Sequence, residues 1–197
     1  VRAKKQNRIG ELFVMGCLSE RYAEELRKEI PEVDKYFGVN RPEEILSFLR
    51  HNYNHTLDAH RILTGLPHYA YLKVSEGCNR NCSFCAIPGI RGKYRSTPVE
   101  DLVKEASILT GNGVKEIILI AQDLSYYGID SYGKPMLGSL ISQLLEVEDL
   151  QWLRLHYLYP GSIPPDVLRL IKNEERVCNY IDIPVQHISE NILKSMR

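Results

Sequence analysis

Three of the five cysteines in this 197-residue chain lie within eight positions, at Cys78, Cys82 and Cys85. Three residues separate the first two cysteines and two residues separate the second from the third, so one short loop carries all three thiols. A disulfide would leave one thiol over, and the polar residues between the cysteines are untypical of inert core thiols. Thiolates grouped in this way are typical ligands of iron–sulfur clusters and of zinc.

The spacing alone leaves both metals open. A structural zinc ion normally takes four Cys or His ligands, and the chain has no second close pair of cysteines. One of the histidines upstream is a possible fourth zinc ligand: His51, His55, His60 or His68. Three thiols on a four-iron cluster would instead leave one iron without a protein ligand. By the logic of a catalytic zinc site, that open position is a place for a small molecule to bind.

The residues around the cysteine loop alternate between predicted strands and helices. Four strand-then-helix units in succession predict an α/β fold, with a parallel sheet, flat or curled into a barrel, and helices packed outside it. In such folds the chemistry lies at the carboxyl ends of the strands, where the cysteine loop is also placed. We predict strands at 69–74, 117–121, 152–159 and 180–185, and helices opened by a capping box at Thr97–Glu100, at 137–145, after Pro164–Pro165 and from Ser189.

The first 51 residues predict the end of a separate, smaller α/β unit. A short apolar strand at 12–15 breaks at Gly16–Cys17, and Ser19 is placed to cap a helix that Pro31 ends. Another strand at 36–39 and a helix over 42–49 follow. The polar, histidine-containing stretch 52–68 is expected to be a linker to the main domain, which takes up residues 69–197.

The composition limits the classes of protein to which the chain can belong. The apolar fraction of 44% and the charged fraction of 25% are ordinary for a globular domain, and the formal net charge is zero. No apolar run is long enough to span a bilayer, so we expect no membrane contact. An odd number of cysteines, three of them crowded, favours a reducing, cytoplasmic setting. A start at Val1 suggests a piece of a longer protein.

The stretch "SEGCNRNCSFCAIPGIRGKYRS" resembles the radical S-adenosylmethionine (SAM) methylthiotransferases. The resemblance implies a partial (β/α) barrel of the TIM type in which Cys78, Cys82 and Cys85 hold a four-iron four-sulfur cluster. It implies that SAM chelates the open iron through its amino and carboxylate groups, and that one electron then releases a 5′-deoxyadenosyl radical. It also places Phe84 beside the adenine, although a core contact is the simpler interpretation of that ring.

Three further polar side chains are candidates for binding SAM. Gln122 and Asp123 follow the second predicted strand, where this superfamily commonly contacts the methionine end. Gln186 ends the fourth predicted strand and is a candidate for the ribose. The roles of Arg154, His156 and Asp182 stay open between contacts to substrate or cofactor and hydrogen bonds that hold the fold.

The stretch "VMGCLSERYAEEL" resembles the end of the family's N-terminal domain. In that domain three cysteines hold a second four-iron cluster that handles the donated sulfur. Cys17 matches the third of these ligands, and the first two have no counterpart in this chain. We therefore expect the fragment to be inactive alone. Cys178 matches no ligand position, and a small buried hydrophobe is its expected role.

Three stretches resemble the branch of the family that modifies an aspartate on protein S twelve of the small ribosomal subunit: "CAIPGIRGKYRS", "AQDLSYYGID" with "RLHYLYP", and "DIPVQHIS". The implied reaction adds a methylthio group at the β-carbon of that aspartate. The implied partners are the ribosomal protein or subunit and an electron donor such as flavodoxin. The alternatives are the branch that modifies adenosine in transfer RNA and, from another class, a zinc-stabilised binding module.

Overall fold

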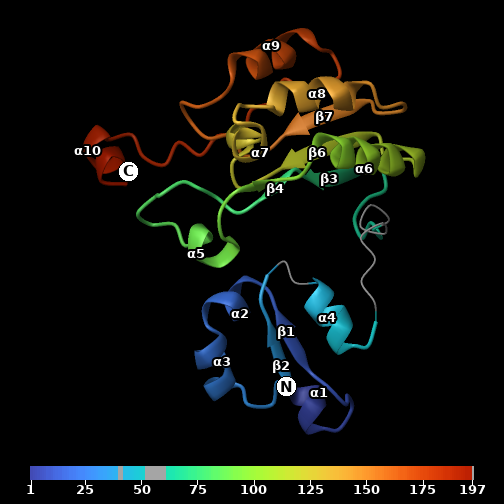
Figure 1. The fold of residues 1–197 in the computed structure, drawn as a ribbon, viewed down its shortest axis with the longest axis vertical. Coiled ribbons are helices and arrows are strands. Elements are labelled where there is room, and N and C mark those ends of the chain that lie inside the picture. Colours follow the sequence, from blue (N-terminus) through green and yellow to red (C-terminus); the bar gives the residue numbers. More distant parts are fainter. Residues whose placement is uncertain (40–41, 52–60, 197) are drawn as a thin grey trace. The chain divides into compact units, whose positions relative to one another are not determined.

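A computed structural model of the chain describes residues 1–39, 42–51 and 61–196. The chain divides into two compact units (Figure 1). Unit 1 comprises Val1–His55 together with Ala86–Gly92, and unit 2 comprises Thr56–Cys85 together with Lys93–Arg197. Residues 52–60 of the predicted linker lie outside the described residues, and 61–68 contain no helix or strand.

Unit 1 is built on two short parallel strands, β1 (Phe13–Met15) and β2 (Lys35–Phe37). Three phenylalanine rings, those of Phe13, Phe37 and Phe48, pack edge to face with centroids 5.3 to 6.0 Å apart and form its apolar centre. The predicted strands and the predicted helix after Pro42 are confirmed. The helices of the unit are α1 (Arg2–Lys5), α2 (Cys17–Arg21), α3 (Ala23–Glu29), α4 (Pro42–Phe48) and α5 (Ile87–Arg91).

The predicted cap at Ser19 is wrong. Helix α2 begins directly after Gly16, and Ser19 lies inside it with its hydroxyl donating to the backbone oxygen of Phe37 at 2.6 Å. Ser19 therefore ties the helix to β2 rather than opening a longer helix. The single predicted helix is two, because Tyr22 separates α2 from α3.

Unit 2 contains a parallel three-stranded sheet in the order β3 (Tyr69–Lys73), β6 (Glu116–Ile120) and β7 (Trp152–Leu155). Tyr71 pairs with Ile118, which in turn pairs with Arg154. The unbroken apolar run in β6 fits its central place, since this strand has a neighbour on each side. The prediction of a parallel sheet is confirmed.

Helices cover one face of this sheet (Figure 1). They are α6 (Val99–Gly111), α8 (Leu137–Leu145) and α9 (Pro165–Asn173), and all three were predicted from the sequence. Alternate side chains of the outer strands, such as Leu72 and Leu153, are buried under them. The other face is more open, because Tyr71 and Trp152 are exposed there.

Three predictions for unit 2 need correction. Strand β7 ends at Leu155 rather than at the predicted residue 159. The described part of the chain has no strand at 180–185: the segment after α9 makes only an isolated bridge, Leu153 with Val177, and a backbone hydrogen bond from Leu158 to Asp182. A strand needs a neighbour along its length, and this segment follows β7 only at separate points. Helix α6 begins at Val99 with Pro98 at its cap, so Thr97 is not the capping residue.

The remaining elements are short and surround the carboxyl ends of the strands. They are β4 (Ser75–Glu76), β5 (Arg95–Ser96), the 3-10 helix η2 (Leu124–Tyr126), α7 (Ile129–Tyr132) and α10 (Glu190–Met196). In the described ranges no helix is both long and apolar enough for a membrane span. The longest of them, α6, has 13 residues, whereas a span needs about 20.

Candidate functional site

The three cysteines lie on the segment that leaves β4 and returns to the sheet at β5. Ser75–Glu76 and Arg95–Ser96 pair antiparallel, so these two short strands fix both ends of the segment. Cys78 is buried, with 8% of its surface exposed, and Cys82 and Cys85 are half-buried. All three are free thiols. They are therefore available as ligands at the carboxyl edge of the sheet.

The surroundings of Cys78 favour its neutral form. Burial raises the pKa of this thiol above its ordinary value, and the negative charges of Asp123, Cys85 and Cys82 raise it further. The backbone N–H of Arg80, 3.4 Å from Cys78 Sγ, acts in the opposite direction. Metal binding requires the thiolate, so a positively charged metal group would supply the compensation that this site needs.

The donor set fits an iron–sulfur cluster. Among the described residues, no three His, Cys, Asp or Glu side chains converge closely enough to hold a single metal ion. A four-iron cluster makes a different demand, because each thiolate binds a separate iron. Cys78, Cys82 and Cys85 are free thiols on one loop, and Cys82 and Cys85 are near enough to Cys78 to act on it electrostatically, as thiols that share one cluster would be.

The residues that follow β6 are held by hydrogen bonds. Asp123 is only 2% exposed, and its Oδ1 accepts a hydrogen bond from the backbone N–H of Ser125 at 2.9 Å. Its carbonyl oxygen accepts from the Tyr94 hydroxyl, also at 2.9 Å, and burial raises the pKa of Tyr94 so that the hydroxyl remains a donor. Gln122 is half-buried and follows the end of β6, the place that the sequence predicted for it.

Phe84 is not part of the core. Its side chain is 58% exposed on the cysteine loop, so a core contact does not explain this ring. Its neighbour Ser83 attaches the loop to the end of α10, donating its backbone N–H to the carbonyl of Met196 at 3.0 Å. The ring is thus available to a bound molecule.

The structure adds Tyr157, which the sequence did not single out. Burial raises the pKa of its hydroxyl, and the charges of Cys85, Asp182, Cys78 and Cys82 act in the same direction. Tyr157 therefore lies in the electrostatic environment of all three loop cysteines. Its φ of 72° is unusual for a residue other than glycine, and such strain often marks a functional position.

The other polar candidates lie in different settings. Arg154 pairs with Glu116 of the neighbouring strand at 2.5 Å, which supports a structural role for this arginine. His156 lies with its ring centroid 5.7 Å from that of Tyr180. Gln186 is exposed, has a φ of 63° and lies on a segment without strand structure rather than at a strand end.

Cys17 belongs to unit 1. It is the first residue of α2, and Nη2 of Arg91 lies 3.4 Å from its sulfur. Arg91 ends α5, the helix that follows the cysteine loop in sequence, and α5 packs on α2 within this unit. The sequence indicated Cys17 as a ligand but gave no sign of this arginine beside it.

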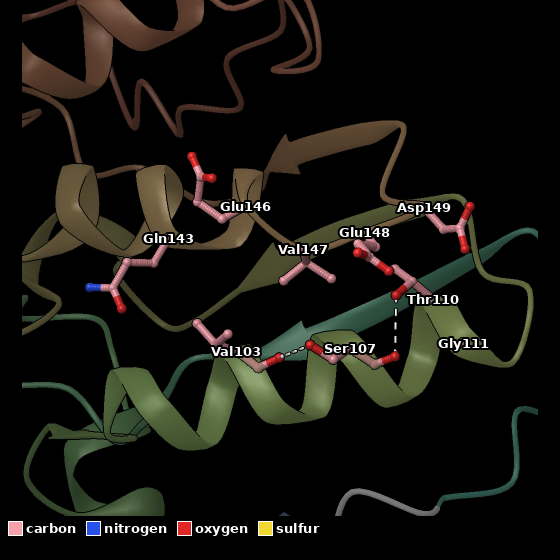
Figure 2. Close-up of a pocket in the computed structure, with 9 residues that line it drawn as sticks. All are labelled: Val103, Ser107, Thr110, Gly111, Gln143, Glu146, Val147, Glu148 and Asp149. Carbon is pink, nitrogen blue, oxygen red and sulfur yellow. Dashed lines mark hydrogen bonds between the residues drawn. The ribbon is translucent and has the colours of Figure 1, made fainter.

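A cavity of about 350 Å³ lies between α6 and α8 of unit 2 (Figure 2). Its lining mixes apolar surface, to which Val103 and Val147 contribute, with the exposed residues Glu146, Glu148 and Asp149. Ser107 and Thr110 use their hydroxyls to bond backbone oxygens within α6, at 2.9 and 3.2 Å. None of the predicted site residues lines this cavity.

A model of the radical SAM superfamily matches residues 72–197, which include the whole cysteine loop and the sheet beyond β3. The chain belongs to this superfamily. The predicted α/β fold class is confirmed, and residues 72–197 are its radical SAM domain.

Curated relatives show which members of the superfamily this chain resembles. A protein of Christiangramia forsetii named ribosomal protein uS12 methylthiotransferase RimO is 55% identical over all 197 residues. Proteins with the same name from Flavobacterium johnsoniae and Porphyromonas gingivalis are 56% identical over 194 residues, 98% of the chain, and 50% identical over 197. The predicted resemblance to methylthiotransferases is confirmed. The chain spans 44 to 45% of the length of these relatives.

A solved structure shares the fold at low identity. It is the radical SAM methyltransferase TsrM of Kitasatospora setae with tryptophan substrate and a SAM analogue bound. The two chains are 15% identical with a TM-score of 0.51, over 68% of this chain and 27% of that one.

Proposed function

We propose that this chain is part of a longer enzyme of the RimO type, which adds a methylthio group to the β-carbon of an aspartate in ribosomal protein uS12. The observation that carries the proposal is identity of 55% along the entire chain with a relative of that name, cysteine loop included. Because the chain covers less than half of that relative, the activity belongs to the complete protein, and the 197 residues are expected to be inactive alone.

The cluster of the radical SAM domain is assigned to Cys78, Cys82 and Cys85. When bound, it supplies one electron to the sulfonium of SAM, whose cleavage gives the radical that removes hydrogen from carbon. The three thiols hold the cluster, and the fourth iron is left for SAM. Phe84 is assigned to the adenine because its ring is exposed on the same loop. Gln122 and Gln186 are assigned to the polar groups of SAM.

The second cluster is assigned to Cys17 together with two ligands from outside this chain. Nη2 of Arg91, 3.4 Å from its sulfur, places a positively charged group beside this proposed ligand. In the proposed reaction, the β-carbon–hydrogen bond of the aspartate would break, and its hydrogen would leave in the 5′-deoxyadenosine of one SAM, whose other product is methionine. A carbon–sulfur bond would form to sulfide-level sulfur held at the second cluster, which returns the electron spent on that SAM. A second SAM would give its methyl group to the sulfur and leave as S-adenosylhomocysteine.

The proposed enzyme acts in the cytoplasm, where its ribosomal substrate is made, and it does not require contact with a membrane. Its electrons come from a small donor such as flavodoxin. The radical route suits the substrate, since the β-carbon–hydrogen bond lacks the acidity that a side-chain base requires.

The test uses the complete protein, purified and reconstituted with iron and sulfide without oxygen. Incubated with SAM, a reductant and uS12 or small ribosomal subunits, it is expected to increase the mass of one uS12 peptide by a methylthio group. Replacement of all three loop cysteines by serine is the matched control and should abolish both bound iron and SAM cleavage.

Three other outcomes would overturn the proposal. Addition of the same mass to transfer RNA, with uS12 unchanged, would assign the enzyme to the adenosine-modifying branch. A colourless protein with one tightly bound zinc ion would indicate a binding module. Full iron content and SAM cleavage in the triple-serine variant would show that Cys78, Cys82 and Cys85 are not the cluster ligands.

A further inference from the structure

The side chain of Arg80 connects the cysteine loop to the residues that follow two strands of the sheet. Its Nε donates to Oδ2 of Asp123, after β6, at 2.9 Å. Its Nη2 donates to Oγ of Ser162, after β7, also at 2.9 Å. One side chain thus joins three segments that are 43 and 82 residues apart in sequence.

The guanidinium of Arg80 packs its face on aromatic rings, in addition to the hydrogen bonds that its edge donates. Its central carbon lies 3.9 Å from the ring centroid of Tyr159 and 6.0 Å from that of Tyr126. Stacking of this kind combined with directed hydrogen bonds is specific to arginine, because the ammonium of lysine is a point charge without a plane.

The partner carboxylate needs this cation. Asp123 is 2% exposed, and a buried carboxylate is costly unless it is paired and hydrogen-bonded. Its Oδ1 is occupied by the backbone N–H of Ser125, and Oδ2 by Arg80. The ion pair therefore attaches the cysteine loop to the residues that follow β6.

The backbone of Arg80 lies within the ligand loop, two residues from both Cys78 and Cys82. Its N–H is 3.4 Å from Cys78 Sγ and directed at it. Hydrogen bonds to ligand sulfurs are among the factors that set the reduction potential of an iron–sulfur cluster. An anchored side chain keeps that N–H in place.

We infer that Arg80 is a positioning residue for the cluster: its side chain locks the Cys78–Cys82 segment to Asp123, Tyr159 and Ser162, and so holds the backbone N–H against the Cys78 sulfur. The inference rests on the proposed function in one respect, that these cysteines bind a cluster. Nε and Nη2 of Arg80 are both engaged within the protein, by Asp123 and Ser162.

The experiment compares Arg80→Met, Arg80→Lys and Tyr159→Leu with the wild type, in the complete reconstituted protein without oxygen. Arg169→Met, an exposed arginine on α9, controls for loss of a positive charge. Three quantities are measured: iron and sulfide per chain, the rate of iron loss to a chelator, and the midpoint potential of the cluster. Circular dichroism checks that each variant is folded.

Arg80→Met should lose iron about tenfold to a hundredfold faster than the wild type, on the scale by which removal of groups that orient metal ligands lowers metal affinity. Its potential should be more negative, because a loosened N–H stabilises the reduced cluster less. Arg80→Lys should restore part of both effects, Tyr159→Leu should shift both in the same direction by less, and Arg169→Met should match the wild type.

A folded Arg80→Met protein with the potential and iron-loss rate of the wild type would overturn the inference and leave the proposed function intact. If Arg80→Met does not fold, Tyr159→Leu and Ser162→Ala test the inference instead, since each keeps the ion pair between Arg80 and Asp123. Unchanged potential and iron loss in both would overturn the inference. A wild-type protein without bound iron would overturn the proposed function and this inference together.

Discussion

Ser96 and Asp130 form a paired hydrogen bond at the point where the cysteine loop rejoins the sheet. The backbone N–H of Ser96 donates to Oδ2 of Asp130 at 2.8 Å, and the Ser96 hydroxyl donates to Oδ1 at 2.6 Å. The same hydroxyl accepts from the backbone N–H of Gly128 at 2.9 Å. One buried serine thereby fixes β5 to the start of α7.

Ser96→Ala should lower the free energy of unfolding by about 1–3 kcal/mol, since it leaves the Gly128 N–H and one carboxylate oxygen without their partner. Denaturant unfolding followed by circular dichroism measures the change. Ser107→Ala is the matched control, because that hydroxyl is exposed on α6 and bonds only its own helix. Equal stability of the two variants would contradict the assigned role of Ser96.

The same pair predicts a loss of stability in acid. Burial opposes ionisation of Asp130, but the hydrogen bonds from the side chain and backbone of Ser96 outweigh it and hold the pKa of Asp130 below its ordinary value. Since the folded-state pKa is the lower one, the stabilisation is complete above the unfolded-state pKa and is lost as the pH falls through the folded-state pKa.

Asp130→Asn should therefore reduce the fall in unfolding free energy between about pH 5 and the acid limit of folding. The measurement is the midpoint of denaturation across that range in wild type and variant. Parallel pH profiles for the two proteins would show that Asp130 does not contribute.

The sequence predicted the central elements of unit 2 well. Strand β6 is an unbroken apolar run, and helices α6 and α8 repeat their apolar residues at helical spacing. Such patterns come from burial of one face or of both, so they reflect the packing directly. The cysteine loop was also predicted at the correct end of the sheet.

The failures have physical causes. Residues 180–185 have the composition of a strand, but a strand also depends on its neighbours, and this segment follows β7 only at isolated points. Ser19 resembles a helix cap, yet its hydroxyl bonds Phe37 across the unit. The contacts of Arg80 could not be predicted because its partners are 43 and 82 residues away in sequence.

Two glycines beside α7 offer a matched pair of substitutions. Gly128 has a φ of 89°, and a Cβ there would lie 2.4 Å from Cβ of Met136. Gly133 has a φ of 69° but open space around a Cβ. Gly133→Ala should cost about 1–2 kcal/mol of stability from backbone strain alone. Gly128→Ala should cost a further 1–3 kcal/mol, roughly, from overpacking.

Thermal and denaturant unfolding of both variants check this difference. The clash at Gly128 involves a side-chain Cβ whose position is fixed by the backbone, so rotation of the methionine cannot relieve it. If Gly128→Ala is no less stable than Gly133→Ala, the close approach of residue 128 to Met136 is not present in solution.

Phe84→Ala separates a binding role from a structural one. Because the ring is 58% exposed, the substitution should change the unfolding free energy by less than about 0.5 kcal/mol. If the ring stacks on adenine, as proposed, it should weaken SAM binding by roughly 1–3 kcal/mol, the range for stacking of one base on an aromatic side chain. Binding of SAM to the reconstituted complete protein and the unfolding midpoint of that protein are measured together.

Val185→Ala is the control for Phe84→Ala, since Val185 is an apolar side chain 72% exposed on another segment. Unchanged SAM affinity in a stable Phe84→Ala protein would remove Phe84 from the proposed site, and a large loss of stability would show that the ring is buried in the complete protein.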